Sequence, residues 1–167
     1  MADVKNLKDL FVAKLRRVYD AEQRLVKALP KLVKAASSPE LKHAFQTHFE
    51  ETEVHVDRLE QIFAAFNTKP AADSCASIKG ILKDGEYALD LHSDPSVKDA
   101  ALIEAAQEAE HFEIAAYGTL RTWALALDKT EEMQILEVTL EEEKNADSLL
   151  TGIARTLNLR AASVPGR

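Results

Sequence analysis

The stretch AALIEAAQEAEHFEIAAYGTL, residues 100–120, has the apolar periodicity of a long α-helix that buries one face. At about 100° per residue, Glu110 lies in the middle of that face, because four apolar side chains fall within about 40° of it: Ile103, Ala106, Ile114 and Tyr117. Burying an ionised carboxylate without a partner is costly. The helix that indicates the fold therefore also carries the first sign of a functional site.

Four long helices and one shorter helix are expected along the chain. The periodicity predicts long helices over about residues 4–35, 39–66, 95–127 and 131–159, and a shorter one over about 75–92. Ser38-Pro39 and Asp94-Pro95 each combine an N-cap residue with a proline at the first helical position. Asp128 and Glu131 have capping-box spacing before the last helix, and Pro30 predicts a kink in the first.

The lengths of the connections predict how these helices are joined. Few residues separate the first two long helices, or the last two, so each pair should form an antiparallel hairpin. About 30 residues separate the two hairpins, enough to travel the length of a bundle. The expected fold is all-α: a ferritin-like four-helix bundle whose long crossover carries the fifth, shorter helix. The chain of 167 residues suits one domain, over 1–160, with a frayed tail over 161–167.

The charge balance and the cysteine count exclude several classes of protein. There are 28 acidic and 21 basic residues, giving a net charge of −7, which disfavours binding to nucleic acid or to an anionic membrane. Cys75 is the single cysteine, so there is no internal disulfide and no resolving partner for a redox sensor. No stretch is apolar enough for a signal peptide or a membrane span. We expect a cytoplasmic protein.

Each of the other long helices also directs a polar group at the core. Glu22 lies within about 40° of four apolar neighbours, and Glu143 has Asp147 about 40° round from it. On the second helix His55 lies inside the apolar stripe, and Glu51 lies at the edge of the stripe. His48 also lies on the stripe, one turn before Glu51. Glu141 and Glu142 are expected to point away from the core.

Three readings of these inward acids remain open. The helices are mis-phased, or the acids form a metal-free polar network, or a metal pair neutralises them. Together, four unpaired buried acids would cost more than the net stability of about 5–15 kcal/mol that a domain has. No Lys or Arg occupies a matching inward position. Carboxylates and imidazole are natural ligands of divalent and trivalent ions, so we favour the metal.

Five segments together resemble the bacterial YciE/YciF stress-protein family, a ferritin-like group. They are YDAE at 19–22, HFEET at 48–52, DAALI at 99–103, EHFEIAAYG at 110–118 and the segment 139–147. The resemblance runs from Leu7 to about Ala154, and residues 100–120 are its most specific part. It implies a five-helix rubrerythrin-like bundle, a homodimer, a dinuclear metal centre and a role in the stress response, with no settled enzymatic activity.

The ferritin-like template supplies single glutamates from two helices and Glu-x-x-His pairs from the other two. Glu22 and Glu110 match the single glutamates, whereas Glu51–His55 and Glu143–Asp147 are spaced by four residues instead of three. The expected metal ligands are therefore Glu22, Glu51, His55, Glu110, Glu143 and Asp147. This oxygen-rich set favours two ions of iron, or of manganese, over zinc. Any activity would be that of a di-metal oxidase or a peroxide-consuming enzyme, with a small oxidant as partner.

The alternative function is that of a structural or interaction protein that keeps the bundle around a vestigial or metal-free polar core. Apolar residues outside the main stripes, such as Leu89 and Leu91, favour a homodimer. His111 is expected at a surface, and Glu113, about 60° from Glu110, beside the ligands. Tyr117 is expected to pack inward and to hydrogen-bond a carboxylate.

Overall fold

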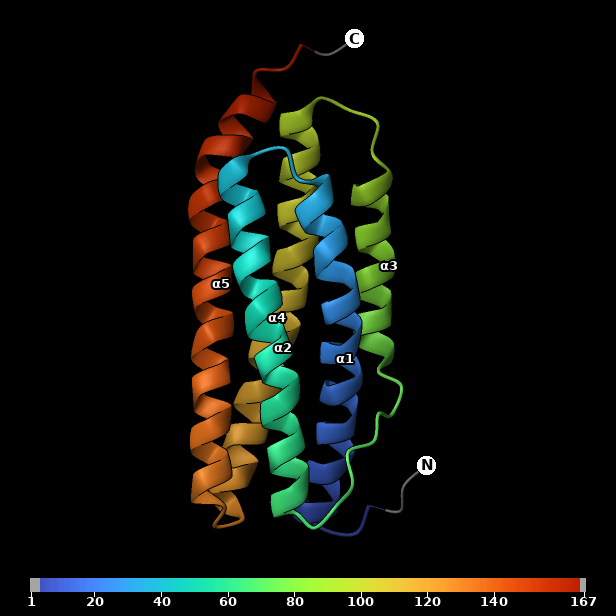
Figure 1. The fold of residues 1–167 in the computed structure, drawn as a ribbon, viewed down its shortest axis with the longest axis vertical. Coiled ribbons are helices and arrows are strands. Elements are labelled where there is room, and N and C mark those ends of the chain that lie inside the picture. The colour runs from blue at the N-terminus through green and yellow to red at the C-terminus, as the bar shows by residue number, and fades with distance from the viewer. Residues whose placement is uncertain (1–3, 166–167) are drawn as a thin grey trace.

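The computed structural model describes residues 4–165, which form five α-helices and no strand. The helices are α1 (Leu7–Ala35), α2 (Pro39–Ala65), α3 (Ala76–Asp90), α4 (Pro95–Ala126) and α5 (Thr130–Ala162) (Figure 1). The predicted fold class is confirmed, and each predicted helix is present within a few residues of its expected limits.

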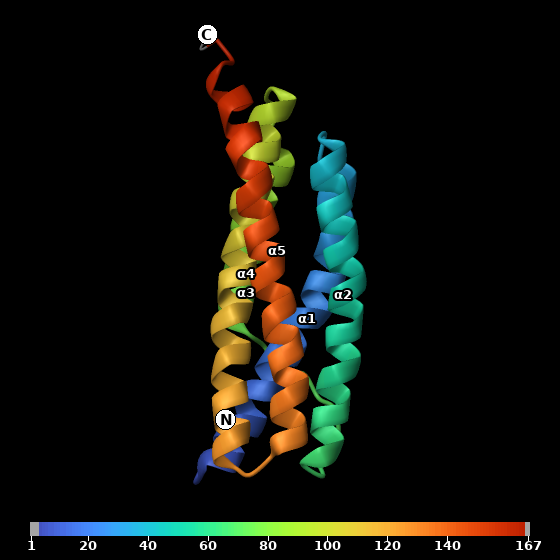
Figure 2. The ribbon, with the colours of Figure 1, turned by 90° about the vertical axis from the view of Figure 1, so that its left-hand side faces the viewer.

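The two hairpins and the crossover are arranged as the connection lengths predict. α1 and α2 form one antiparallel hairpin, α4 and α5 form the other, and α2 packs on α5 while α1 packs on α4 (Figures 1 and 2). Between them, the chain returns along the side of the bundle through α3, which packs on α1 and α4. As a result α2 and α4 run in the same direction, and the middles of all four long helices meet inside the bundle.

Local signals account for where the helices begin. The side chain of Asn6 accepts a hydrogen bond from the backbone N–H of Asp9, so α1 begins at Leu7 and not at Val4. Ser38 and Asp94 cap α2 and α4 in the same way, each followed by its proline. α1 continues as one helix through Pro30.

The turn between α4 and α5 differs from the prediction. Asp128 has a φ of 55° and does not cap α5, whose N-cap is Lys129 without a side-chain hydrogen bond. Instead, the Lys129 N–H donates to the carbonyl of Ala124 and the Asp128 N–H to that of Leu125, which is a Schellman ending of α4. The capping-box assignment is wrong because the left-handed backbone that closes α4 takes Asp128 out of the N-cap position.

The interior of residues 4–165 contains three apolar clusters: two fill its ends, and a third joins α1, α3 and α4. The lower core contains aromatic residues, such as the stacked pair Phe11 and Phe66, with ring centroids 4.4 Å apart. The upper core, in which Phe45 packs with smaller residues such as Leu41 and Leu102, fills the other end. The middles of the long helices lie between them, and the polar side chains of the interior gather there.

Two further expectations concern the ends and the surface of the molecule. α5 extends to Ala162, so the first two residues of the tail expected to fray are helical, while Gly166 and Arg167 lie outside the described residues. Leu89 is partly buried against the upper core and is not a free apolar side chain. Among the described residues, no helix is long and apolar enough to cross a membrane.

Candidate metal centre

Six ionisable side chains from all four long helices are buried in the middle of the bundle. They are Glu22 of α1 (0% exposed), His48 (6%) and His55 (0%) of α2, Glu110 (3%) and Glu113 (1%) of α4, and Glu143 (0%) of α5. Acidic groups this deeply buried are rare in proteins unless they are paired or bind a metal.

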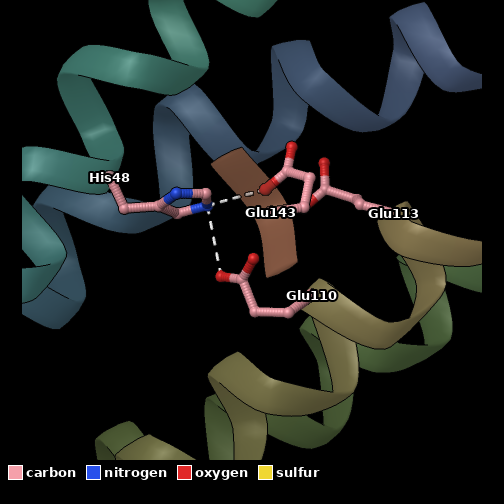
Figure 3. Close-up of side chains that lie close together, drawn as sticks. All are labelled: His48, Glu110, Glu113 and Glu143. Carbon is pink, nitrogen blue, oxygen red and sulfur yellow. Dashed lines mark ion pairs between the residues drawn. The ribbon is translucent and has the colours of Figure 1, made fainter. Parts of the chain in front are cut away.

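Glu143 occupies the centre of this cluster and faces both histidines. Its Oε2 atom lies 3.6 Å from His48 Nε2, and its Oε1 atom lies 3.0 Å from His55 Nδ1. His48 Nε2 also lies 3.2 Å from Glu110 Oε1, so the imidazole and the carboxylates of α4 and α5 converge (Figure 3). On the other side, His55 Nδ1 lies 3.8 Å from Glu22 Oε1.

The cluster divides into two overlapping groups of candidate ligands. His48, Glu110, Glu113 and Glu143, which we call the His48 half-site, each offer a ligand atom within 4.8 Å of the others. Glu22, His55 and Glu143, the His55 half-site, do the same. Glu143 belongs to both half-sites and so connects them.

The donor set fits a metal better than it fits a hydrogen-bonded network. Across the described part of the chain, eight nitrogen and oxygen atoms of the six side chains have no hydrogen-bond partner, including both oxygens of Glu113 and of Glu143. Buried polar atoms are normally paired, and each one left unpaired is costly. Atoms that approach closely without hydrogen-bonding geometry are expected of ligands that face a common ion. Mixed carboxylate and imidazole donors suit iron or manganese.

Without an ion, the cluster strongly perturbs the pKa of its own members. Burial, and then the charge of Glu143, raise the pKa of Glu22 to about 7. Burial also raises the pKa values of Glu110 and Glu113 well above the usual range. Burial alone would lower the pKa of His48, but Glu110 and other carboxylates raise it to about 10. Each of these directions favours the protonated form, so without an ion the cluster would bind protons in place of part of its negative charge.

A chain of hydrogen bonds fixes the orientation of His55. Its Nε2 atom lies 2.8 Å from Glu142 Oε2, and Arg58 donates to both oxygens of the same carboxylate. The hydrogen bond from Arg58 lowers the pKa of Glu142 despite its partial burial, so Glu142 is ionised and can only accept. His55 therefore donates from Nε2, which leaves Nδ1 directed at Glu143 and Glu22. A carboxylate behind a histidine is the usual support of a metal-binding imidazole.

Tyr117 supports the carboxylate of α1. Its hydroxyl donates a hydrogen bond to Glu22 Oε1, and the ring is 1% exposed, as the inward position of Tyr117 on α4 predicts. The pKa of the Tyr117 hydroxyl is raised by burial and by Glu22, so the hydroxyl stays protonated and remains a donor. The His55 half-site thus has an oriented group behind each of its outer ligands.

The structure brings four of the six predicted ligands together and leaves two outside. Glu22, His55, Glu110 and Glu143 lie in the cluster, whereas the side chain of Glu51 is 38% exposed and lies 3.6 Å from His48 Nδ1. The position of Glu51 at the edge of the apolar stripe leads its side chain toward the surface and outside both groups of candidate ligands, so its role as a ligand stays a prediction.

Asp147 is the second predicted ligand that lies elsewhere. It accepts a hydrogen bond of 2.9 Å from the Gln107 amide, and His111 Nε2 lies 3.4 Å from the same oxygen. The short aspartate side chain, one turn beyond Glu143, is held between α4 and α5 near the surface. His111 is on that surface too, with 70% of its side chain exposed, as expected.

Three residues lie at the cluster although their angular positions on the helices did not single them out as site residues. His48 lies seven residues before His55, two helical turns away on the same face, so the sequence already carried its signal. Glu113 was expected only beside the ligands, yet it is 1% exposed and belongs to the His48 half-site. Glu142 was expected to point away, but it reaches sideways to His55, a contact that depends on where α2 lies.

Comparisons with known proteins agree with this architecture. The family described as "Domain of unknown function (DUF892)" matches residues 6–163. The curated Escherichia coli (strain K12) protein YciF is 39% identical over 153 residues, which covers 91% of this chain and 92% of YciF.

Solved structures give the same relationship. The crystal structure of the E. coli stress protein YciF superposes with a TM-score of 0.89 at 38% identity, covering 92% of this chain and 98% of that one. YcfI from Rhodopseudomonas palustris is also 38% identical. It superposes with a TM-score of 0.86, and the match covers 90% of this chain and 96% of that one. A ferritin-like diiron-carboxylate protein from Bacillus anthracis shares the fold at 15% identity, with a TM-score of 0.69 and coverage of 90% and 99%. The chain therefore belongs to the DUF892 family, together with the E. coli stress protein YciF, and has the ferritin-like fold.

Proposed function

We propose that the protein binds two metal ions, iron or manganese, in the middle of its helix bundle. The observation that supports this most directly is the set of buried carboxylate oxygens without hydrogen-bond partners in the described structure. One ion would be held by His48, Glu110, Glu113 and Glu143, and the other by Glu22, His55 and Glu143. Such a pair of ions supplies Lewis-acid and redox chemistry toward oxygen or peroxide.

The chain's own residues would prepare this site in three ways. Glu143 supplies one oxygen to each half-site. Glu142 and Tyr117 orient His55 and Glu22 through their hydrogen bonds. The lower and upper cores exclude water from both ends of the cluster, which strengthens every electrostatic interaction within it.

The biological role that we propose is in the stress response, with a small oxidant as the reaction partner. The support is the relationship to E. coli YciF, which is described as a stress protein. A ferritin-like bundle with a metal pair would give such a role a chemical basis, because the ions can react with peroxide or oxygen while the surrounding protein limits access.

A metal-free structural role is the second candidate, and one observation favours it. The pKa of His48 is raised to about 10, so a protonated His48 would offset part of the negative charge of the cluster. Protonation of Glu110 and Glu113, whose pKa values are also raised, would offset more. This arrangement still leaves buried atoms unpaired, and for that reason we prefer the metal.

Metal analysis and melting curves distinguish the two candidates. Protein purified without chelator should contain close to two equivalents of metal, and adding Fe²⁺ or Mn²⁺ to stripped protein should raise its melting temperature by mass action. Glu110→Ala should lose at least one equivalent together with that thermal shift. Glu108→Ala, an exposed glutamate on the same helix, is the matched control and should behave like wild type.

The metal-free variants sharpen this test. Stripped Glu110→Ala, with one buried acid fewer, should melt no lower than stripped wild type, because the remaining carboxylates repel one another less. A hydrogen-bonded network predicts the reverse, a plain loss of stability on mutation. Wild-type protein that is indifferent to both metals, with a destabilised Glu110→Ala variant, would overturn the metal proposal in favour of the structural role.

A further inference from the structure

An apolar cavity of about 200 Å³ leads from the side of the bundle to the candidate metal centre. It lies between α1, α3 and α4, and its inner end is formed by His48 and Glu110. α3, which lies beside α1 in Figure 1, thus forms one wall of the cavity, and His48 and Glu110, joined by a dashed line in Figure 3, form its inner end.

The walls of this cavity select an apolar occupant of about the size of one ring. α1 contributes leucines at 25, 29 and 32, and α3 contributes Ile81, Leu82 and Leu89, while small alanines of α4 leave the space open. The outer part of the cavity is charged, because the exposed Lys27, Lys31 and Glu86 and the half-buried Arg24 also line it. An engineered cavity of about 150 Å³ lined by Leu, Ile and Phe binds benzene, which sets the volume that one ring needs. The somewhat larger volume here can hold a ring with one further group.

The inner end of the cavity selects the polar group of that occupant. Glu110 is 3% exposed, it borders the cavity, and no hydrogen-bond partner of its Oε2 atom occurs within residues 4–165. A hydroxyl can donate to such an oxygen. A carboxylate directed at this inner end would be repelled by the acids already clustered there, so a neutral hydroxyl fits the inner end better than an anion does.

A second cavity also reaches His48 and Glu110, from the side of α2 and α5. It measures about 100 Å³, and Glu51 and Asn145 are among the residues that line it. Its smaller volume suits water or a small ion more than an organic ring. The two sides of the His48 half-site therefore differ in what they can admit.

We propose that the larger cavity is a binding site for a phenol-class ligand, a single apolar ring with its hydroxyl directed at His48 and Glu110. The assignment of this ligand as a substrate rests on the proposed metal function, because the hydroxyl end would meet the ions of the His48 half-site. Occupation of the cavity itself depends only on its volume, its walls and the unpaired oxygen.

Calorimetric titration with phenol, before and after the protein is stripped of metal, tests the proposal. Phenol should bind both forms, and benzoate should bind at least about tenfold more weakly. Ala28→Phe on α1 and Ala105→Phe on α4 place rings into the cavity from two walls, so each should weaken phenol binding by at least about tenfold. Ala13→Phe, at an equally half-buried alanine of α1 away from this cavity, is the control and should leave binding unchanged.

Each outcome has a defined meaning. Phenol binding that both cavity variants reduce, with the control unaffected, supports the site even where no metal is found. Metal binding without phenol binding to wild type leaves the metal proposal standing and overturns this one. Benzoate that binds as tightly as phenol, or a control variant that loses as much as Ala28→Phe, would also overturn it. Circular dichroism of each variant establishes that the bundle is intact, and two variants on different walls keep the test valid if one misfolds.

Discussion

The two half-sites of the cluster share Glu143 but differ in how they are supported. In the His55 half-site every outer ligand has an oriented partner, since Glu142 holds His55 and Tyr117 holds Glu22. In the His48 half-site, His48 Nδ1 faces only the partly exposed Glu51, and both cavities open beside it. Hydrogen bonds thus fix the ligands of the His55 half-site, whereas the His48 half-site borders cavities that a ligand can enter.

This difference indicates separate roles for the two ions that we propose. Hydrogen bonds behind a ligand fix its orientation and raise its affinity for metal. Ligands without such support adjust more easily when another molecule approaches. We therefore expect the His55 half-site to hold its ion more tightly, and the His48 half-site to be the one that reacts with small molecules.

The largest effect is expected where the half-sites meet. Replacing Glu143 by Ala removes the carboxylate common to both, so the protein should lose both metal equivalents and the whole metal-dependent rise in melting temperature. Metal content by mass spectrometry and melting curves measure this. Asp147→Ala, one turn further along α5 and outside the cluster, should keep both equivalents; equal losses in the two variants would contradict the assignment.

The next largest effect separates the half-sites. Glu22→Gln should remove the ion of the His55 half-site, and Glu113→Gln the ion of the His48 half-site, each leaving about one equivalent because the other ligand group stays complete. Metal titration of stripped protein counts the remaining ions. If either substitution abolishes both ions, the half-sites do not bind independently and the comparison fails.

A smaller effect is expected from the supporting carboxylates. Glu142→Gln weakens the acceptor behind His55, so affinity at the His55 half-site should fall by about 10–100-fold, the usual cost of losing such a partner. Glu51→Gln should change affinity at the His48 half-site far less, since Glu51 is partly exposed. Glu141→Gln, an exposed neighbour, is the control, and competition with a chelator measures all three. Equal effects of Glu142→Gln and Glu51→Gln would show that the two half-sites are supported alike.

The smallest expected effect is a change of stability with pH. In stripped protein the pKa of Glu22 rises from 4.5 to about 7, and that of His48 from 6.5 to about 10, so the folded state binds more protons than the unfolded chain. The stability that these groups contribute is present below their ordinary pKa values and is lost as the pH rises through the folded ones. Metal ions bind the deprotonated ligands, so their stabilisation grows with pH.

The gap in melting temperature between metal-loaded and stripped protein should therefore widen between about pH 5 and pH 8. A change of 1 kcal/mol corresponds to about 2–4 °C in a domain of this size, which is within reach of scanning calorimetry. Stripped Glu22→Gln should show a shallower pH dependence than stripped wild type. A gap that is constant, or that narrows with rising pH, would contradict the linkage.

Angular position along a helix predicted most of the cluster and failed at two informative places. Counting at about 100° per residue put Asp147 about 40° from Glu143 and Glu113 about 60° from Glu110. The structure reverses that ranking, because the Gln107 amide holds Asp147 near the surface while Glu113 is fully enclosed. A stripe wide enough to bury a helix contains more residues than can reach one point, and partners on other helices decide among them.

The sequence by itself determined the helices, the caps of α2 and α4 and the bundle topology, because periodicity, Ser38-Pro39, Asp94-Pro95 and the connection lengths are local properties of the chain. It also determined that each long helix carries an inward polar group. Only the tertiary structure decided which of these groups meet, that Glu143 faces both histidines, and that Glu142 reaches His55. These contacts depend on the rotation and axial position of each helix against its neighbours. Packing between the helices sets both, so the sequence of one helix alone does not determine them.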